Sequence, residues 1–111
     1  MANFFKSETF NLTTTNLTTA LTITTSAIAI VRSVQASHAS ASNVDVDLYL
    51  KKSGGSDVEI AHVELNKSTE NLAKNVINLE GGDILKIQAD TANEITGQIS
   101  YLLIDRSQEN G

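Results

Sequence analysis

The chain has 111 residues, with 13 acidic and 8 basic side chains and a formal net charge of −5. It contains no cysteine and no proline. The lack of cysteine excludes a disulfide framework, a thiolate zinc site and a cysteine nucleophile. The acidic balance argues against a general nucleic-acid binder and against docking on anionic lipid. The length corresponds to one domain spanning residues 1–111.

The first part of the chain is rich in aromatic and β-branched residues. All three phenylalanines, Phe4, Phe5 and Phe10, lie in the first ten residues. Residues 1–10 are therefore interpreted either as an N-terminal arm that docks into a neighbouring subunit or as a first strand that covers its own core. The threonine-rich residues 17–24 favour a strand, because threonine suits a pleated surface.

Residues 28–37 predict another strand, and residues 36–43 predict a loop of small polar residues. Alternation places Ile28, Ile30, Arg32 and Val34 on one face of this strand. Arg32 would then lie on the apolar face. A buried arginine needs a paired acid, either within the fold or across an interface.

Residues 44–50 alternate strictly between apolar and polar side chains, and residues 58–65 largely repeat the pattern. Two such segments predict strands with one buried face. The glycine-centred polar residues 51–57 separate them, so the two segments predict a β-hairpin.

The rest of the chain continues in short segments. Residues 68–75 resemble a capping box and are interpreted as a loop or a single helical turn. Further strands are predicted at 76–79, 84–89 and 94–104, followed by a polar tail at 105–111. Seven or eight strands separated by turns at short intervals indicate an all-β fold, a single antiparallel β-sandwich of jelly-roll or immunoglobulin-like topology.

The residues that usually carry catalysis are sparse. His38 is expected in a serine- and alanine-rich loop, and His62 on the polar face of a strand, with no surrounding motif of a catalytic triad. Asp45 and Asp47 share one strand face, as the outer residues of an antiparallel sheet ordinarily do. The sequence therefore predicts no catalytic residue, no cofactor and no metal site, and the protein is expected not to be an enzyme.

No segment predicts a membrane span. The longest apolar run, residues 27–31, is far shorter than the roughly 20 residues that a spanning helix needs. The first six residues lack the charged and apolar regions of a signal peptide.

The order of segments resembles a known group of proteins. The opening Met-Ala-Asn-x-Phe-Lys, with an extra phenylalanine here, precedes the threonine-rich strand. It is followed by the apolar segment 29–38, the alternating segment 44–50 and the segment Leu-Glu-Gly-Gly-Asp-Ile-Leu-Lys-Ile-Gln-Ala at 79–89. This pattern resembles small virion structural proteins of tailed bacteriophages, notably phages of marine bacteria.

The resemblance implies a capsid decoration or cement protein, assembled in the host cytoplasm and located in the virion. A neck, tail or fibre-associated protein, or a carbohydrate- or receptor-binding module, are the alternatives. The implied partners are the major capsid protein or other virion proteins and further copies of the chain, with a trimer as one arrangement. Nucleic acid and membrane are not expected partners. Phe4, Phe5 and Arg32 are the candidate interface residues.

Overall fold

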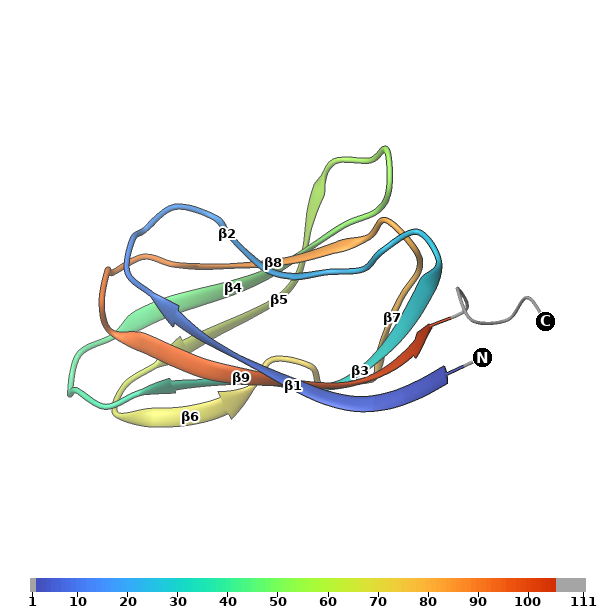
Figure 1. The fold of residues 1–111 in the computed structure, drawn as a ribbon. Coiled ribbons are helices and arrows are strands. Elements are labelled where there is room, and N and C mark those ends of the chain that lie inside the picture. The colour runs from blue at the N-terminus through green and yellow to red at the C-terminus, as the bar shows by residue number, and fades with distance from the viewer. Residues whose placement is uncertain (1, 106–111) are drawn as a thin grey trace.

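The computed structural model describes residues 2–105, which form nine strands and no helix. Figure 1 shows two antiparallel sheets packed face to face. The strands are β1 (Ala2–Leu12), β2 (Thr18–Thr22), β3 (Ala27–His38), β4 (Val44–Lys51), β5 (Asp57–Leu65), β6 (Ser68–Asn71), β7 (Ile77–Leu79), β8 (Ile84–Ala89) and β9 (Ile95–Asp105). The predicted all-β antiparallel sandwich is confirmed. Apart from Asp105, the predicted polar tail lies outside the described residues.

The strand order distinguishes between the two predicted topologies. One sheet has the order β1-β9-β3-β6, with β7 also paired to β3, and the other has the order β2-β8-β4-β5. Among the described strands, only β4 and β5 form a hairpin of sequence neighbours, and most other connections cross between the sheets. This alternation is the winding of a jelly roll, in which two Greek keys close around one core.

The core lies between the two sheets and follows the alternation of each strand. β4 contributes Val44, Val46 and Leu48, and β8 contributes Leu85 and Ile87, all fully buried. Opposite them lie buried residues of β3 and β9, namely Val31, Val34, Ile95 and Ile99. Burial of these aliphatic side chains is the main favourable contribution to the stability of the fold.

The predicted loop or helical turn at residues 68–75 is wrong for its first half. Residues 68–71 form β6, which pairs with residues 35–38 of β3. The side-chain oxygen of Asn71 accepts hydrogen bonds from the backbone N–H groups of Val34 and Ala73, at 2.9 and 3.0 Å. The polar residues that resemble a helix start are instead used to pair and end a strand.

The predicted faces of β3 hold for Ile28 and Ile30, which share the outer face, but are wrong for Val34. Ala27, Ala29 and Val31 are buried, and so is Val34, because the register against β9 shifts between Val31 and Ser33. Arg32 occupies this β-bulge and is exposed. Because of this one extra residue, the side chains after the bulge point to the opposite face from the one that alternation predicts. Arg32 therefore needs no buried acid as a partner.

The predicted loop at 36–43 begins later than expected. β3 continues to His38, whose side chain points into the sandwich and is 2% exposed.

None of the described elements is a helix that could cross a membrane.

Candidate functional site

The N-terminal strand β1 lies at the edge of its sheet. It pairs with β9 over its whole length, from Ala2 opposite Asp105 to Leu12 opposite Ile95. No other described strand pairs with its second edge. An exposed edge of this kind presents a row of backbone donors and acceptors that can pair with a strand of another chain.

Phe5 projects from the outer face of β1 and is 77% exposed. It lies opposite Leu102 of β9, which lies opposite Ile30 of β3, so the three side chains form one apolar row across the sheet. Ile104 and Ile28 form the neighbouring row. These aliphatic side chains are partly exposed. We call these five residues the outer apolar patch.

Arg32 borders the outer apolar patch. Its guanidinium carbon lies 5.9 Å from the centre of the Phe5 ring, within the range of a cation–π contact. Both residues line a shallow surface depression of about 300 Å³ together with Ser7 and Ser100. Two of the three interface candidates from the sequence are thus brought together, although β1 and β3 are separated in the sheet by β9.

Phe4 lies on the other face of β1. It is 45% exposed, and the Lys6 ammonium lies 5.9 Å from its ring centre. The inner face of β1 is covered only from Phe10 onward, where the aromatic ring packs against Gly97 of β9. The first half of β1 is therefore accessible from both faces.

Tyr101 of β9 lies beside this uncovered part of β1, opposite Lys6. Its hydroxyl donates a hydrogen bond to Glu8 Oε2 at 3.1 Å. Burial, together with the bond to the Glu8 carboxylate, raises the pKa of Tyr101 to about 12. The bond fixes β1 to β9 on the inner face, next to the exposed Phe4 and Lys6.

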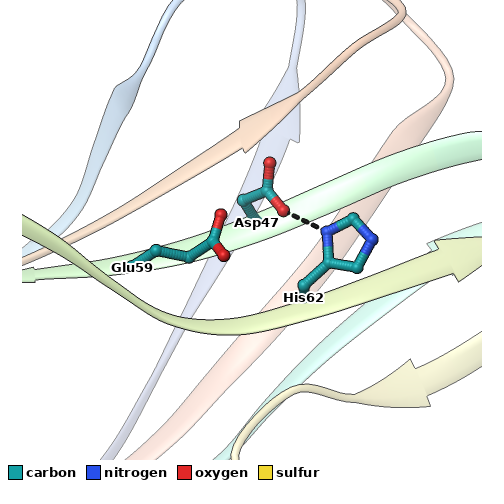
Figure 2. A group of neighbouring side chains, drawn as sticks. All are labelled: Asp47, Glu59 and His62. Atoms are coloured by element: carbon teal, nitrogen blue, oxygen red, sulfur yellow. Dashed lines mark hydrogen bonds and ion pairs between the residues drawn. The ribbon is translucent and has the colours of Figure 1, made fainter.

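A second group of polar side chains lies on the outer face of β4 and β5. Figure 2 shows Asp47 of β4 with Glu59 and His62 of β5. His62 Nδ1 is hydrogen-bonded to Asp47 Oδ1, and His62 Nε2 lies 4.0 Å from Asp45 Oδ1. The hydrogen bond with Asp47, helped by the negative charges of Asp47, Asp45 and Glu59, raises the pKa of His62.

A β-bulge explains why Glu59 belongs to this group. Leu48 pairs with Ala61, but the next residue, Tyr49, pairs with Glu59, so Ile60 has no partner on β4. The extra residue turns Glu59 onto the face that carries His62. Strict alternation from the sequence would have placed these two side chains on opposite faces, so the group was not predicted.

The two histidines do not form one site. His62 lies on the outer face of the four-stranded sheet, whereas His38 is buried inside the sandwich on the other sheet. His38 Nε2 is 2.9 Å from the Ser42 carbonyl oxygen, and Nδ1 is 3.5 Å from Glu94 Oε2. His38 therefore holds the β3–β4 and β8–β9 connections together.

A groove of about 300 Å³ lies beside β5. It is lined by residues of β5 and of the segment that follows β6, including Ile60, Val63, Leu72, Val76 and Ile77. Ile60 is 41% and Val76 is 57% exposed, so part of the rim is apolar. Polar residues also line the groove, namely His62, Lys74 and Asn75. No phenylalanine, tyrosine or tryptophan lines this groove.

Comparison with known proteins identifies the fold. No family model matches the chain, and no curated protein matches it. Among solved structures it is similar to a chain described as "Bacillus endospore appendages form a novel family of disulfide-linked pili", with a TM-score of 0.53. The likeness covers 92% of this chain and 84% of that chain at 10% sequence identity. At 10% sequence identity this similarity concerns the fold alone, which is an all-β sandwich.

Proposed function

We propose that the protein is a non-enzymatic structural subunit that acts in many copies, and that its role is to decorate and cement a phage capsid. The observation that carries the proposal is the accessible edge of β1 together with Phe5 and Arg32. An exposed aromatic residue next to an arginine is a typical anchor of a protein interface. Many weak contacts of this kind become strong through avidity when copies act together.

The fold and the sequence support this proposal in different ways. Jelly rolls serve as viral capsid domains and as lectins, so the fold permits an assembly role without requiring it. The pattern of segments that resembles phage virion proteins favours the capsid. The similar solved chain belongs to a pilus described as disulfide-linked. The present sequence has no cysteine, so its copies would not be linked to one another by disulfides.

The proposal is tested on purified phage particles and on particles from a mutant that lacks the gene. Quantitative mass spectrometry should find the protein at a copy number comparable to that of the major capsid protein. Recombinant protein should rebind to the mutant particles. Phe5→Ser should weaken this rebinding, because it removes the aromatic anchor from β1 while leaving the backbone pairing with β9 intact.

Val58→Ser is the matched control, since Val58 is an apolar residue, 59% exposed, on the other sheet. This variant should rebind like the original protein. Absence of the protein from purified particles would contradict the proposal. Equal loss of binding in both variants would show that the Phe5 surface is not the interface. A copy number of only a few per particle would instead support a neck, tail or fibre location.

A further inference from the structure

We propose that the outer face of β4 and β5 binds one divalent transition-metal cation of the Zn²⁺ type through Asp47, Glu59 and His62. We call these three residues the β4–β5 triad. The site is independent of the proposed interface, which lies on the other sheet.

The distances between the donor atoms carry the proposal. One imidazole nitrogen and one oxygen from each carboxylate all lie within 4.8 Å of one another. Zn²⁺ bonds of about 2.0–2.2 Å place two ligands of a tetrahedral ion roughly 3.4 Å apart. Small side-chain rotations therefore suffice to bring the three atoms onto one ion. The ion would replace the hydrogen bond between Asp47 and His62.

The backbone holds the triad in this arrangement. Asp47 and His62 are directly opposite each other on paired strands, and the bulge at Ile60 brings Glu59 to the same face. Ligands on paired strands are held more precisely than ligands on a loop. The bulge thus gives the outer face a third donor that a regular strand would have turned inward.

The charges around the triad leave the carboxylates available to a cation. Among the described residues, His62 is the ion-pair partner of both Asp45 and Asp47. The neighbouring Lys86 is paired with Asp57, at 3.0 Å. Asp45 adds a further negative charge 4.0 Å from the second imidazole nitrogen. No lysine or arginine within residues 2–105 forms an ion pair with the triad, so these carboxylates would be free to stabilise a bound dication.

The donor set selects the class of cation. One imidazole and two carboxylates suit Zn²⁺ and related first-row metals, whereas Ca²⁺ and Mg²⁺ prefer all-oxygen sites with more ligands. The triad is open to solvent on its outer side, because Glu59 and His62 are exposed. Water, or a group from a neighbouring molecule, would complete the coordination.

The test is titration of the full chain with ZnCl₂, followed by isothermal calorimetry and by two-dimensional amide NMR. We expect one equivalent to bind, with chemical-shift changes concentrated in β4 and β5, and a much weaker response to CaCl₂. His62→Gln and Glu59→Gln should each lower the affinity by at least about tenfold. Both side chains are exposed, so circular dichroism should show that both variants keep the fold.

Glu64→Gln is the matched control, because Glu64 is an exposed carboxylate on the same strand but outside the triad. This variant should bind Zn²⁺ with an affinity within about twofold of the original protein, because an exposed surface charge has only a small effect. No saturable binding of Zn²⁺, or equal losses in all three variants, would overturn the proposal. Shift changes centred on His38 would also overturn it. The titration uses no phage particles, so its failure is distinct from failure of the capsid role.

Discussion

Asp83 is a buried carboxylate that joins two turns at one end of the sandwich. It is 1% exposed and accepts hydrogen bonds from the Lys52 ammonium at 2.6 Å and from the backbone N–H groups of Glu80 at 2.8 Å and Ser53 at 3.1 Å. Burial alone would raise its pKa, but the bond from Lys52 and the two backbone bonds outweigh burial and lower the pKa of Asp83.

This lowered pKa predicts a loss of stability in acid. A carboxyl whose pKa is lower in the folded state than in the unfolded state stabilises the fold fully above its unfolded value. That stabilisation is lost as the pH falls through the folded value. We expect the free energy of unfolding to decrease below about pH 4. Asp83→Asn should be about 1–3 kcal/mol less stable at neutral pH and should lose less stability on acidification.

Urea unfolding followed by circular dichroism at a series of pH values measures both effects. Glu64→Gln is the control, because it removes an exposed carboxylate from β5 and leaves Asp83 with its three bonds in place. It should lose stability in acid as the original protein does. If Asp83→Asn and the original protein lost stability in parallel as the pH fell, Asp83 would not be the group responsible.

The positions of Phe5, Arg32 and Glu59 could be predicted from the sequence only in part. The N-terminal segment is a first strand paired with β9, which was one of its two interpretations, but Phe5 points outward and does not cover the core. Its contact with Arg32 could not be predicted, because it depends on β9 lying between β1 and β3. Arg32 was expected to be buried, and Glu59 was overlooked, for the same physical reason. Each lies at or beside a β-bulge, and a bulge leaves no mark in an alternating pattern.

At the scale of elements, strands that pair with a sequence neighbour were predicted more reliably than strands that pair with a distant segment. The hairpin of β4 and β5 was predicted because its turn and both strands are continuous in sequence. β6 was missed because its residues lack alternating apolar side chains. It is a strand only because β3, about 30 residues away in the chain, provides an edge for it. Its tertiary pairing overrides the weak local preference for a helical turn.

The connection between β5 and β6 contains a residue in an unfavourable conformation. Lys67 has a φ of 47°, in the left-handed region that suits glycine. Its backbone N–H donates to the Ser40 carbonyl oxygen at 3.0 Å, which fixes this conformation. We expect Lys67→Gly to raise the free energy of unfolding by about 0.5–1 kcal/mol, because glycine adopts this φ without a steric penalty.

Thermal unfolding measures this gain in stability. Lys67→Ala shows whether the gain comes from the backbone conformation or from loss of the lysine side chain. The alanine variant removes the lysine amine but keeps Cβ, so it should show no increase in melting temperature. A rise of the same size in both variants would mean that charge, rather than backbone conformation, limits the stability of this connection.

At the scale of the whole molecule, the jelly-roll winding makes most pairings distant in sequence. β1 pairs with β9, and β2 pairs with β8. Composition and periodicity predicted two packed sheets, but they did not specify which strands are neighbours. Strand order depends on how all the inner faces fit together, and this information is spread over the whole chain.

The same winding, combined with the lack of proline, predicts the refolding kinetics. Non-local β pairing is slow, so refolding should take milliseconds to seconds. With no proline in the sequence, refolding should lack the phase of roughly 10–100 s that proline isomerisation causes. Stopped-flow fluorescence of the tyrosines after dilution from urea measures the main refolding rate and shows whether a slow phase is present. A slow phase on the isomerisation timescale that is independent of protein concentration would contradict this prediction.

The pairing of Ala2 with Asp105 has a practical consequence for protein engineering. The first and last strands end side by side at one end of the sandwich (Figure 1). A cargo domain fused directly before β1 or directly after β9 would therefore be carried at the same pole. The opposite pole, formed by the connections at 13–17, 39–43 and 90–94, would remain clear. The start of β1 and the end of β9 could also be joined by a short linker, and the chain reopened at the exposed β4–β5 turn.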